Sequence, residues 1–158
     1  MIKPAGSGYT ALTGAAERPD TELPMEDETT QIYARVGDDE PFHALVEAFY
    51  RGVEADPILR PLYPADLTHA KLHLVWFLIQ RFGGPLRYQE ERGHPRLRMR
   101  HLPFQIGRAE STAWLRHMSA AVEAVPAFSP FRDVMGRYFS EAAAFLINHG
   151  EIPAIADS

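Results

Sequence analysis

The sequence predicts an all-α protein. From Thr29 onward, apolar residues recur with the spacing of amphipathic helices, and no segment shows the sustained alternation typical of a half-buried strand. Glycines and prolines separate the periodic segments from one another. The chain has 158 residues, of which 46% are hydrophobic. This length and composition suit one domain with a substantial core.

The first half of the chain contains one short and one long predicted helix. Ile32, Tyr33 and Val36 indicate the short leading helix. In the long helix, Asp38 or Asp39 is expected to act as the cap, and Asp56-Pro57 to end it. Its apolar stripe follows the positions i, i+3, i+4, i+7, i+8 and i+11, which are Phe42, Leu45, Val46, Phe49, Tyr50 and Val53.

Three longer helices are expected after Asp66. The segment 66–82 is apolar nearly all round in its middle, so we expect it to be buried on more than one side. Gly83-Gly84-Pro85 should end it. Two later stripes predict the remaining helices: one contains Trp114, Met118, Ala121, Val122 and Val125, and the other contains Phe131, Val134, Met135, Tyr138, Phe139, Ala142, Phe145 and Leu146.

The segment 82–104 is the most informative part of the chain. Pro95 suits a first helical position, and Pro103 prevents much continuation beyond His101. A helix of about two turns is expected between them. A helix this short does not persist alone in water, so it must pack against something else. His101 would then be held in a fixed pose.

The two ends of the chain are not expected to join this domain. Residues 1–28 carry two basic and six acidic side chains, which is −4 of the net charge of −5, and almost no large apolar residue. We expect them to be disordered. The predicted domain covers 29–150, and 151–158 form a C-terminal tail. The longest apolar run is far shorter than a membrane span, and no signal-peptide core is evident, so a cytoplasmic location is expected.

Several classes of site can be weighed from residue types. The chain has no cysteine, so any metal must use histidine or oxygen ligands. His69 and His73 lie four residues apart, but no HExxH pattern or third ligand supports zinc. His43, His117 and His149 are expected to face solvent. Taken alone, His101 could be a core histidine bonded to a backbone carbonyl.

A cluster of arginines surrounds His101. Residues 87–100 contain five arginines against two glutamates, a local charge of +3 that attracts anions. Nucleic acid is disfavoured as a partner, because the chain is acidic overall and carries no recognised binding motif. Arg100 is suitably placed to bind a carboxylate through two parallel hydrogen bonds. Tyr50 and Trp114 lie on inward helix faces, where their polar groups need partners.

Together these residues resemble the group II truncated haemoglobins. The resemblance rests on FGGP, Tyr88, the string ERGHPRLRMRH, Trp114 thirteen residues after His101, and the Phe49-Tyr50 pair. It extends from about Tyr33 to Phe145. It implies a truncated globin fold, a two-over-two α-helical sandwich around haem b.

The resemblance also implies a role for each site residue. His101 would be the proximal ligand of the haem iron. Tyr50, Tyr63 and Trp114 would line the distal side, where Ala70 would replace the distal histidine of animal globins and Leu74 would wall the pocket. Tyr88, Arg100 and His73 would reach the haem propionates.

The function implied is reversible binding of O2, and of NO and CO, with high affinity and slow release. Trp114 NH can only donate, whereas tyrosine hydroxyls donate and accept. Two donors to a partly charged ligand, at about 1.5–3 kcal/mol each, would slow its release by roughly two to four orders of magnitude. Alternatives are nitric oxide dioxygenation or a peroxidase-like activity with a separate reductase, and a haem-free helical interaction module. The sequence leaves open whether the chain forms a homodimer.

Overall fold

The computed structural model describes residues 28–150. The predicted disordered segment, apart from Glu28, and the predicted C-terminal tail therefore lie outside the described residues. Within 28–150 the regular elements are all helical, as predicted, and no strand occurs. They are α2 (Ile32–Val36), α3 (Glu40–Glu54), the 3₁₀ helix η1 (Arg60–Leu62), α4 (Thr68–Arg81), α5 (Arg87–Arg92), α6 (Leu97–His101), α7 (Arg108–Ala124), the 3₁₀ helix η2 (Pro126–Phe131) and α8 (Arg132–Phe145).

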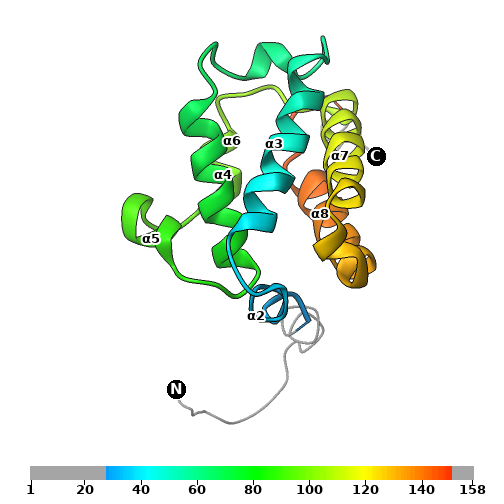
Figure 1. Ribbon diagram of the computed structural model, residues 1–158. Helices are drawn as coiled ribbons and strands as arrows, with labels where there is room; N and C mark the ends of the chain where they lie inside the picture. The colour runs from blue at the N-terminus through cyan, green and yellow to red at the C-terminus, as the bar shows by residue number, and fades with distance from the viewer. Residues whose placement is uncertain (1–27, 151–158) are drawn as a thin grey trace, which may run out of the picture.

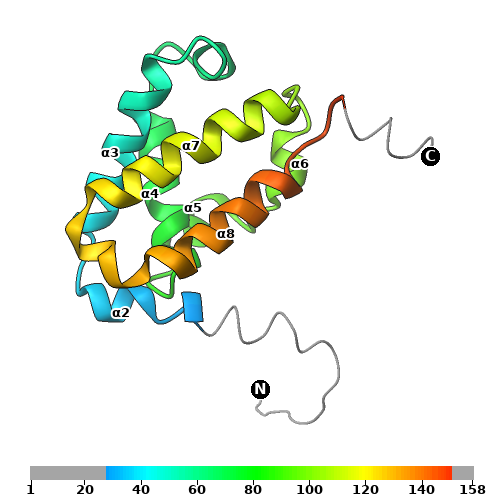
Figure 2. The ribbon, with the colours of Figure 1, turned by 90° about the vertical axis from the view of Figure 1, so that its right-hand side faces the viewer.

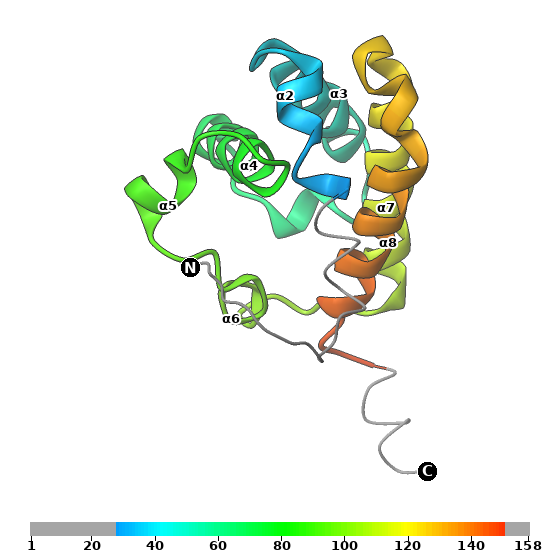
Figure 3. The same ribbon diagram turned by 90° about the horizontal axis from the view of Figure 1, so that it is seen from below.

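Two pairs of antiparallel helices form the body of the molecule. α3 packs antiparallel to α4, and α7 packs antiparallel to α8 (Figures 1 and 2). α3 also packs against α7, so it joins the two pairs. Seen from below, α6 lies across from α3, with α4 to one side and the α7–α8 pair to the other (Figure 3).

The sequence of α3 explains its position between both pairs. All six apolar residues of the predicted stripe are buried. Asp39 is the N-cap residue by position, but the Asp38 side chain makes the capping contact, accepting a hydrogen bond from Glu40 N at 2.8 Å. The predicted helix is confirmed, and both aspartates contribute to its N-terminus: Asp39 by position and Asp38 by its hydrogen bond.

α4 is covered on several sides, as its composition predicts. Every residue from 70 to 81 is at least partly buried. The helix ends at Arg81, and Gly83 follows with a φ of +100°. A Cβ atom at Gly83 would overlap the carbonyl oxygen of Thr30. Glycine is therefore needed there both for the backbone conformation and for the close approach of the segment before α2.

Aromatic side chains fill the core where the two helix pairs meet. Phe42 contacts Phe128 edge to face, with ring centroids 5.1 Å apart, and lies 6.3 Å from Phe82 in a stacked arrangement. All three rings are fully buried. Hydrocarbon closes this end of the molecule, and a cavity lies nearer to α6.

The segment between α4 and α7 differs in detail from its prediction. α6 has five residues and begins at Leu97, so the expected helix of about two turns starting near Pro95 was too long. Arg96 interrupts it, because its φ of 45° and ψ of 55° place it in the left-handed region. α5 was not predicted. None of the helices within 28–150 is long and apolar enough to cross a bilayer.

Candidate functional site

A cavity of about 320 Å³ lies among α3, α4, α6, α7 and α8. This size is in the range of sites for small organic ligands. Its lining is mostly apolar. Eight of the nine site residues predicted from the sequence line it, namely Tyr50, Tyr63, Ala70, His73, Leu74, Tyr88, His101 and Trp114. Arg100 is not among the described residues that line it.

Tyr50, Tyr63 and Trp114 form one side of the cavity, which we call the aromatic wall. The Tyr50 and Tyr63 rings meet edge to face, with centroids 5.5 Å apart. Phe49 also lines the cavity, and its ring centroid lies 5.0 Å from that of Tyr50 and 5.6 Å from that of Trp114. Trp114 acts on the Tyr63 hydroxyl as a hydrogen-bond donor and so lowers its pKa. The three polar side chains therefore come together from α3, α7 and the residue that follows η1.

The hydroxyl groups of this wall stay protonated at any physiological pH. Burial raises the pKa of Tyr50 far above its ordinary value, and the neighbouring Tyr63 adds to the shift. Burial also raises the pKa of Tyr63 to about 12, although the hydrogen bond from Trp114 opposes the rise. Since Tyr63 accepts from Trp114, its own proton is available to donate elsewhere. The wall can therefore offer hydrogen-bond donors to a ligand in the cavity.

His101 forms the opposite side with Leu97, Phe104 and Ile106, and we call this group the histidine wall. Nδ1 of His101 lies 2.7 Å from the carbonyl oxygen of Leu97, one turn earlier in α6. A carbonyl only accepts, so Nδ1 carries the proton and the neutral ring keeps a lone pair on Nε2. This is the tautomer and orientation of a histidine that ligates a metal through Nε2.

The chain segment after α8 holds α6 in place. Asn148 Nδ2 donates to the His101 carbonyl at 3.2 Å, and Asn148 Oδ1 accepts from Ile106 N at 2.9 Å. Arg98 donates to the Phe145 carbonyl, and its guanidinium lies over the Phe145 ring. Sequence reasoning missed Asn148, because nothing local relates it to a histidine 47 residues earlier.

A positively charged rim lies beside Tyr88. Burial lowers the pKa of His73, and the nearby charges of Arg92, His69 and Arg100 lower it further. The guanidinium groups of Arg92 and Arg100 each lie 5.8 Å from the Tyr88 ring. Arg100 also donates to the backbone: Nε to Pro95 O at 2.7 Å, and Nη2 to Arg92 O at 2.8 Å and to His94 O at 3.3 Å. It therefore shapes the loop before α6.

The remaining histidines correct one expectation. His43 and His149 are exposed, as expected. His117 does not face solvent: its side chain is 20% exposed, and Nε2 lies 2.7 Å from the Asp56 carboxylate. The helical stripe gave no sign of this contact, because the partner lies 61 residues away. Within the described residues, no group of three His, Cys, Asp or Glu side chains is arranged to hold a metal ion.

The residues of this cavity suit a flat apolar cofactor that carries a metal. An imidazole with a lone pair on Nε2 lines one wall, buried donors line the other, and hydrocarbon and cationic side chains lie at the margins. Two helix pairs packed around such a cavity make a fold of the globin class. Residues 31–144 match the model of the bacterial-like globin family. The chain belongs to that family, and within it to the group II truncated haemoglobins.

Individual relatives agree with this assignment. The group 2 truncated haemoglobin YjbI of Bacillus subtilis is 38% identical over 119 residues, which are 75% of this chain and 89% of that protein. The crystal structure of haemoglobin from Chloroflexus aurantiacus is 52% identical, with a TM-score of 0.72, covering 75% of this chain and 98% of its own. The structure of a truncated oxygen-avid haemoglobin from Bacillus subtilis is 38% identical, with a TM-score of 0.70, covering 74% and 98%. These likenesses confirm the predicted family and fold.

Proposed function

We propose that the cavity binds haem b, one iron protoporphyrin IX per chain, with His101 as the proximal ligand. Family membership implies the cofactor. The observation that carries the proposal is the pose of His101, whose Nδ1 is tied to Leu97 and whose Nε2 is left as the metal-binding atom. When bound, haem supplies an iron position that takes O2, NO or CO. Everything else is done by the side chains around it.

The aromatic wall would govern how tightly a ligand is held. Trp114 donates to Tyr63, and this polarises the Tyr63 hydroxyl as a donor toward the cavity. Tyr50, buried beside it, supplies a second hydroxyl. A partly charged oxygen ligand would accept a hydrogen bond from each hydroxyl. At about 1.5–3 kcal/mol per donor, release slows by roughly two to four orders of magnitude. The oxygen-avid relative from Bacillus subtilis supports this expectation.

The remaining lining residues would fit and orient the cofactor. Ala70 and Leu74 supply apolar surface, one small and one large, on the face that α4 turns toward the cavity. Tyr88 and His73 would hold the propionates through hydrogen bonds. Arg100 would act from behind Tyr88, where its charge favours the carboxylates while its hydrogen bonds keep the 92–95 loop in place.

Hemin titration and ligand kinetics test the proposal. The purified chain should take up one hemin with a sharp Soret band, and the reduced protein should bind O2 reversibly. Oxygen release, followed by stopped-flow mixing with CO, should be slow. A chain that takes up no hemin would overturn the proposal.

Slow release also favours a second candidate function. A ligand held for long by buried donors is available to react with nitric oxide. Nitric oxide and O2 together take up one electron to give nitrate, so a separate reductase would be needed for turnover. Mixing the oxygenated protein with nitric oxide separates the two functions. Stoichiometric nitrate and recurrent turnover with a reductant would support the enzyme, and their absence would leave ligand binding alone.

A further inference from the structure

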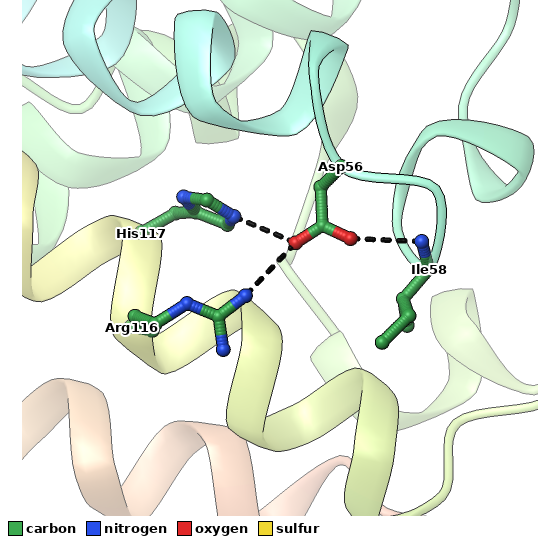
Figure 4. Close-up of polar contacts among 4 residues, drawn as sticks. All are labelled: Asp56, Ile58, Arg116 and His117. Atoms are coloured by element: carbon green, nitrogen blue, oxygen red, sulfur yellow. Dashed lines mark hydrogen bonds and ion pairs between the residues drawn. The ribbon is translucent and has the colours of Figure 1, made fainter.

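A buried carboxylate lies just outside the cavity, where α3 ends. Asp56 is only 6% exposed, and its two oxygens have different partners. Oδ2 lies 2.7 Å from His117 Nε2 and 3.2 Å from Arg116 Nη2, whereas Oδ1 accepts a hydrogen bond from Ile58 N at 2.8 Å. Figure 4 shows the carboxylate between the α7 side chains and the turn after α3. One side chain therefore joins α7 to the segment 56–65.

The packing around His117 fixes its ring. A Cβ atom at Gly52 would overlap the His117 ring at Nδ1, so the imidazole lies directly against the α3 backbone. Its other nitrogen then faces Asp56. Arg116 contributes less, because its side chain is 60% exposed and water competes for its charge. The Asp56–His117 contact is the better-defined half of the cluster.

From Asp56, the segment 56–65 leads to Tyr63. Arg60 N donates to the Asp56 carbonyl at 2.8 Å. The Arg60 guanidinium then donates to the Tyr63 carbonyl at 3.1 Å and to those of Pro64 and Ala65 at 3.0 and 3.1 Å. The backbone that carries Tyr63 is thus tied to the turn that Asp56 anchors.

From His117, α7 leads to the same tyrosine. Trp114 precedes His117 by three residues, so the two side chains lie on neighbouring positions of one helix surface. Trp114 and Tyr63 both line the cavity, and Trp114 lowers the pKa of the Tyr63 hydroxyl as a hydrogen-bond donor. The Asp56–His117 contact outside the cavity and the Tyr63–Trp114 contact inside it therefore join the same two segments, 56–65 and α7.

We propose that Asp56, paired with His117, is a positioning residue that holds the segment 56–65 on α7 and so keeps the Tyr63 hydroxyl at the Trp114 indole. Asp56 does not line the cavity within the described residues, so it acts on a ligand only through Tyr63. The proposal rests on the proposed function of the aromatic wall. In the Asp56→Asn variant, an NH2 group replaces one carboxylate oxygen. Because an NH2 group cannot accept a hydrogen bond, either His117 or Ile58 loses its acceptor.

The test uses the haem-loaded chain and two readouts that report on distal hydrogen bonding. Asp56→Asn should speed oxygen dissociation about fivefold, the effect of weakening one hydrogen bond. It should also add a second, higher-frequency CO stretching band in the infrared. Hemin uptake should be unchanged. Glu123→Gln, which removes the same charge from the exposed Arg132–Glu123 pair, is the matched control and should change neither readout.

A double variant tests the route of action. If Asp56 acts through Tyr63, then Asp56→Asn should have no further effect on oxygen release in a Tyr63→Phe background. Equal acceleration in both backgrounds would overturn the proposal, as would an Asp56→Asn variant that behaves like Glu123→Gln. His117→Gln, measured in the same way, decides the matter if Asp56→Asn does not fold. Failure of the parent chain to bind hemin would instead overturn the proposed function, before any variant is compared.

Discussion

The two walls of the cavity are built in different ways. In the aromatic wall, Tyr50 and Trp114 come from the long helices α3 and α7, and the fully buried Phe49 packs against both. The histidine wall is carried by α6, a helix of five residues, all of which are at least partly exposed. Core packing fixes Tyr50 and Trp114 of the first wall, whereas hydrogen bonds from Asn148, Arg98 and Arg100 fix the second wall.

This difference separates two properties of the protein. Substitutions in the aromatic wall should alter how a ligand is held while leaving the cofactor in place. Substitutions in or around the histidine wall should alter how firmly the cofactor is held.

His101→Ala should have the largest effect. It removes the proposed axial ligand, so hemin loss to a scavenger globin should accelerate by more than the roughly 10–100-fold typical of outer-shell changes. The Soret band should also shift. His43→Ala, at an exposed position of α3, is the control and should match the parent chain. An unaltered Soret band in His101→Ala would show that another residue is the ligand.

Trp114→Phe should have the second-largest effect. It should change the rate of oxygen dissociation and leave the binding of the cofactor unchanged. It deletes the donor to Tyr63 while keeping an aromatic ring against Phe49 and Phe139. Oxygen dissociation should be at least about tenfold faster. The only other tryptophan, Trp76, lies under Arg87 and does not line the cavity within the described residues, so Trp76→Phe is the control. An unchanged rate in Trp114→Phe would mean that the tyrosines alone govern release.

The same contrast explains what the sequence could predict. The apolar stripe of α3 predicts that Tyr50 faces inward, because Tyr50 falls on the helical spacing of the other apolar residues. His101 is marked by the prolines on either side of it. Both signals are local. Family resemblance supplied the grouping of the aromatic wall, which periodicity alone does not give.

Contacts between distant segments were out of reach. Asp56 and His117 are 61 residues apart, and a polar contact between a turn and a distant helix leaves no periodic trace. The expectation that His117 faces solvent was wrong for this reason. Arg96 likewise adopts a left-handed conformation that no glycine or asparagine announces, so the start of α6 was misplaced. Sequence patterns predict faces of helices, whereas the partner of each polar side chain depends on tertiary packing.

Asn148→Ala should affect the cofactor moderately and the ligand little. It removes the hydrogen bond to the His101 carbonyl and the one from Ile106 N, so α6 loses part of its support. Hemin loss should accelerate about tenfold, as for other outer-shell partners of a metal ligand. Oxygen dissociation should change less than about twofold. His149→Ala, next in sequence and exposed, is the control. A large change in oxygen release would break the separation of the two walls.

The smallest expected effect is that of acidification on the Asp56–His117 contact, measured as a change in the free energy of unfolding. The hydrogen bond with His117 is the main cause that holds the pKa of Asp56 below its ordinary value of 3.8, and the Ile58 amide adds to it. A carboxyl group whose pKa is lower in the folded state stabilises that state above its unfolded pKa, and the contribution disappears as pH falls through the folded pKa. The free energy of unfolding of the haem-loaded parent should therefore exceed that of Asp56→Asn at neutral pH, and the gap should narrow below about pH 4. Haem release in acid is common to both proteins, so denaturant melts at several pH values isolate the carboxylate. A gap that stays constant down to pH 3 would mean that Asp56 contributes through shape and not through charge.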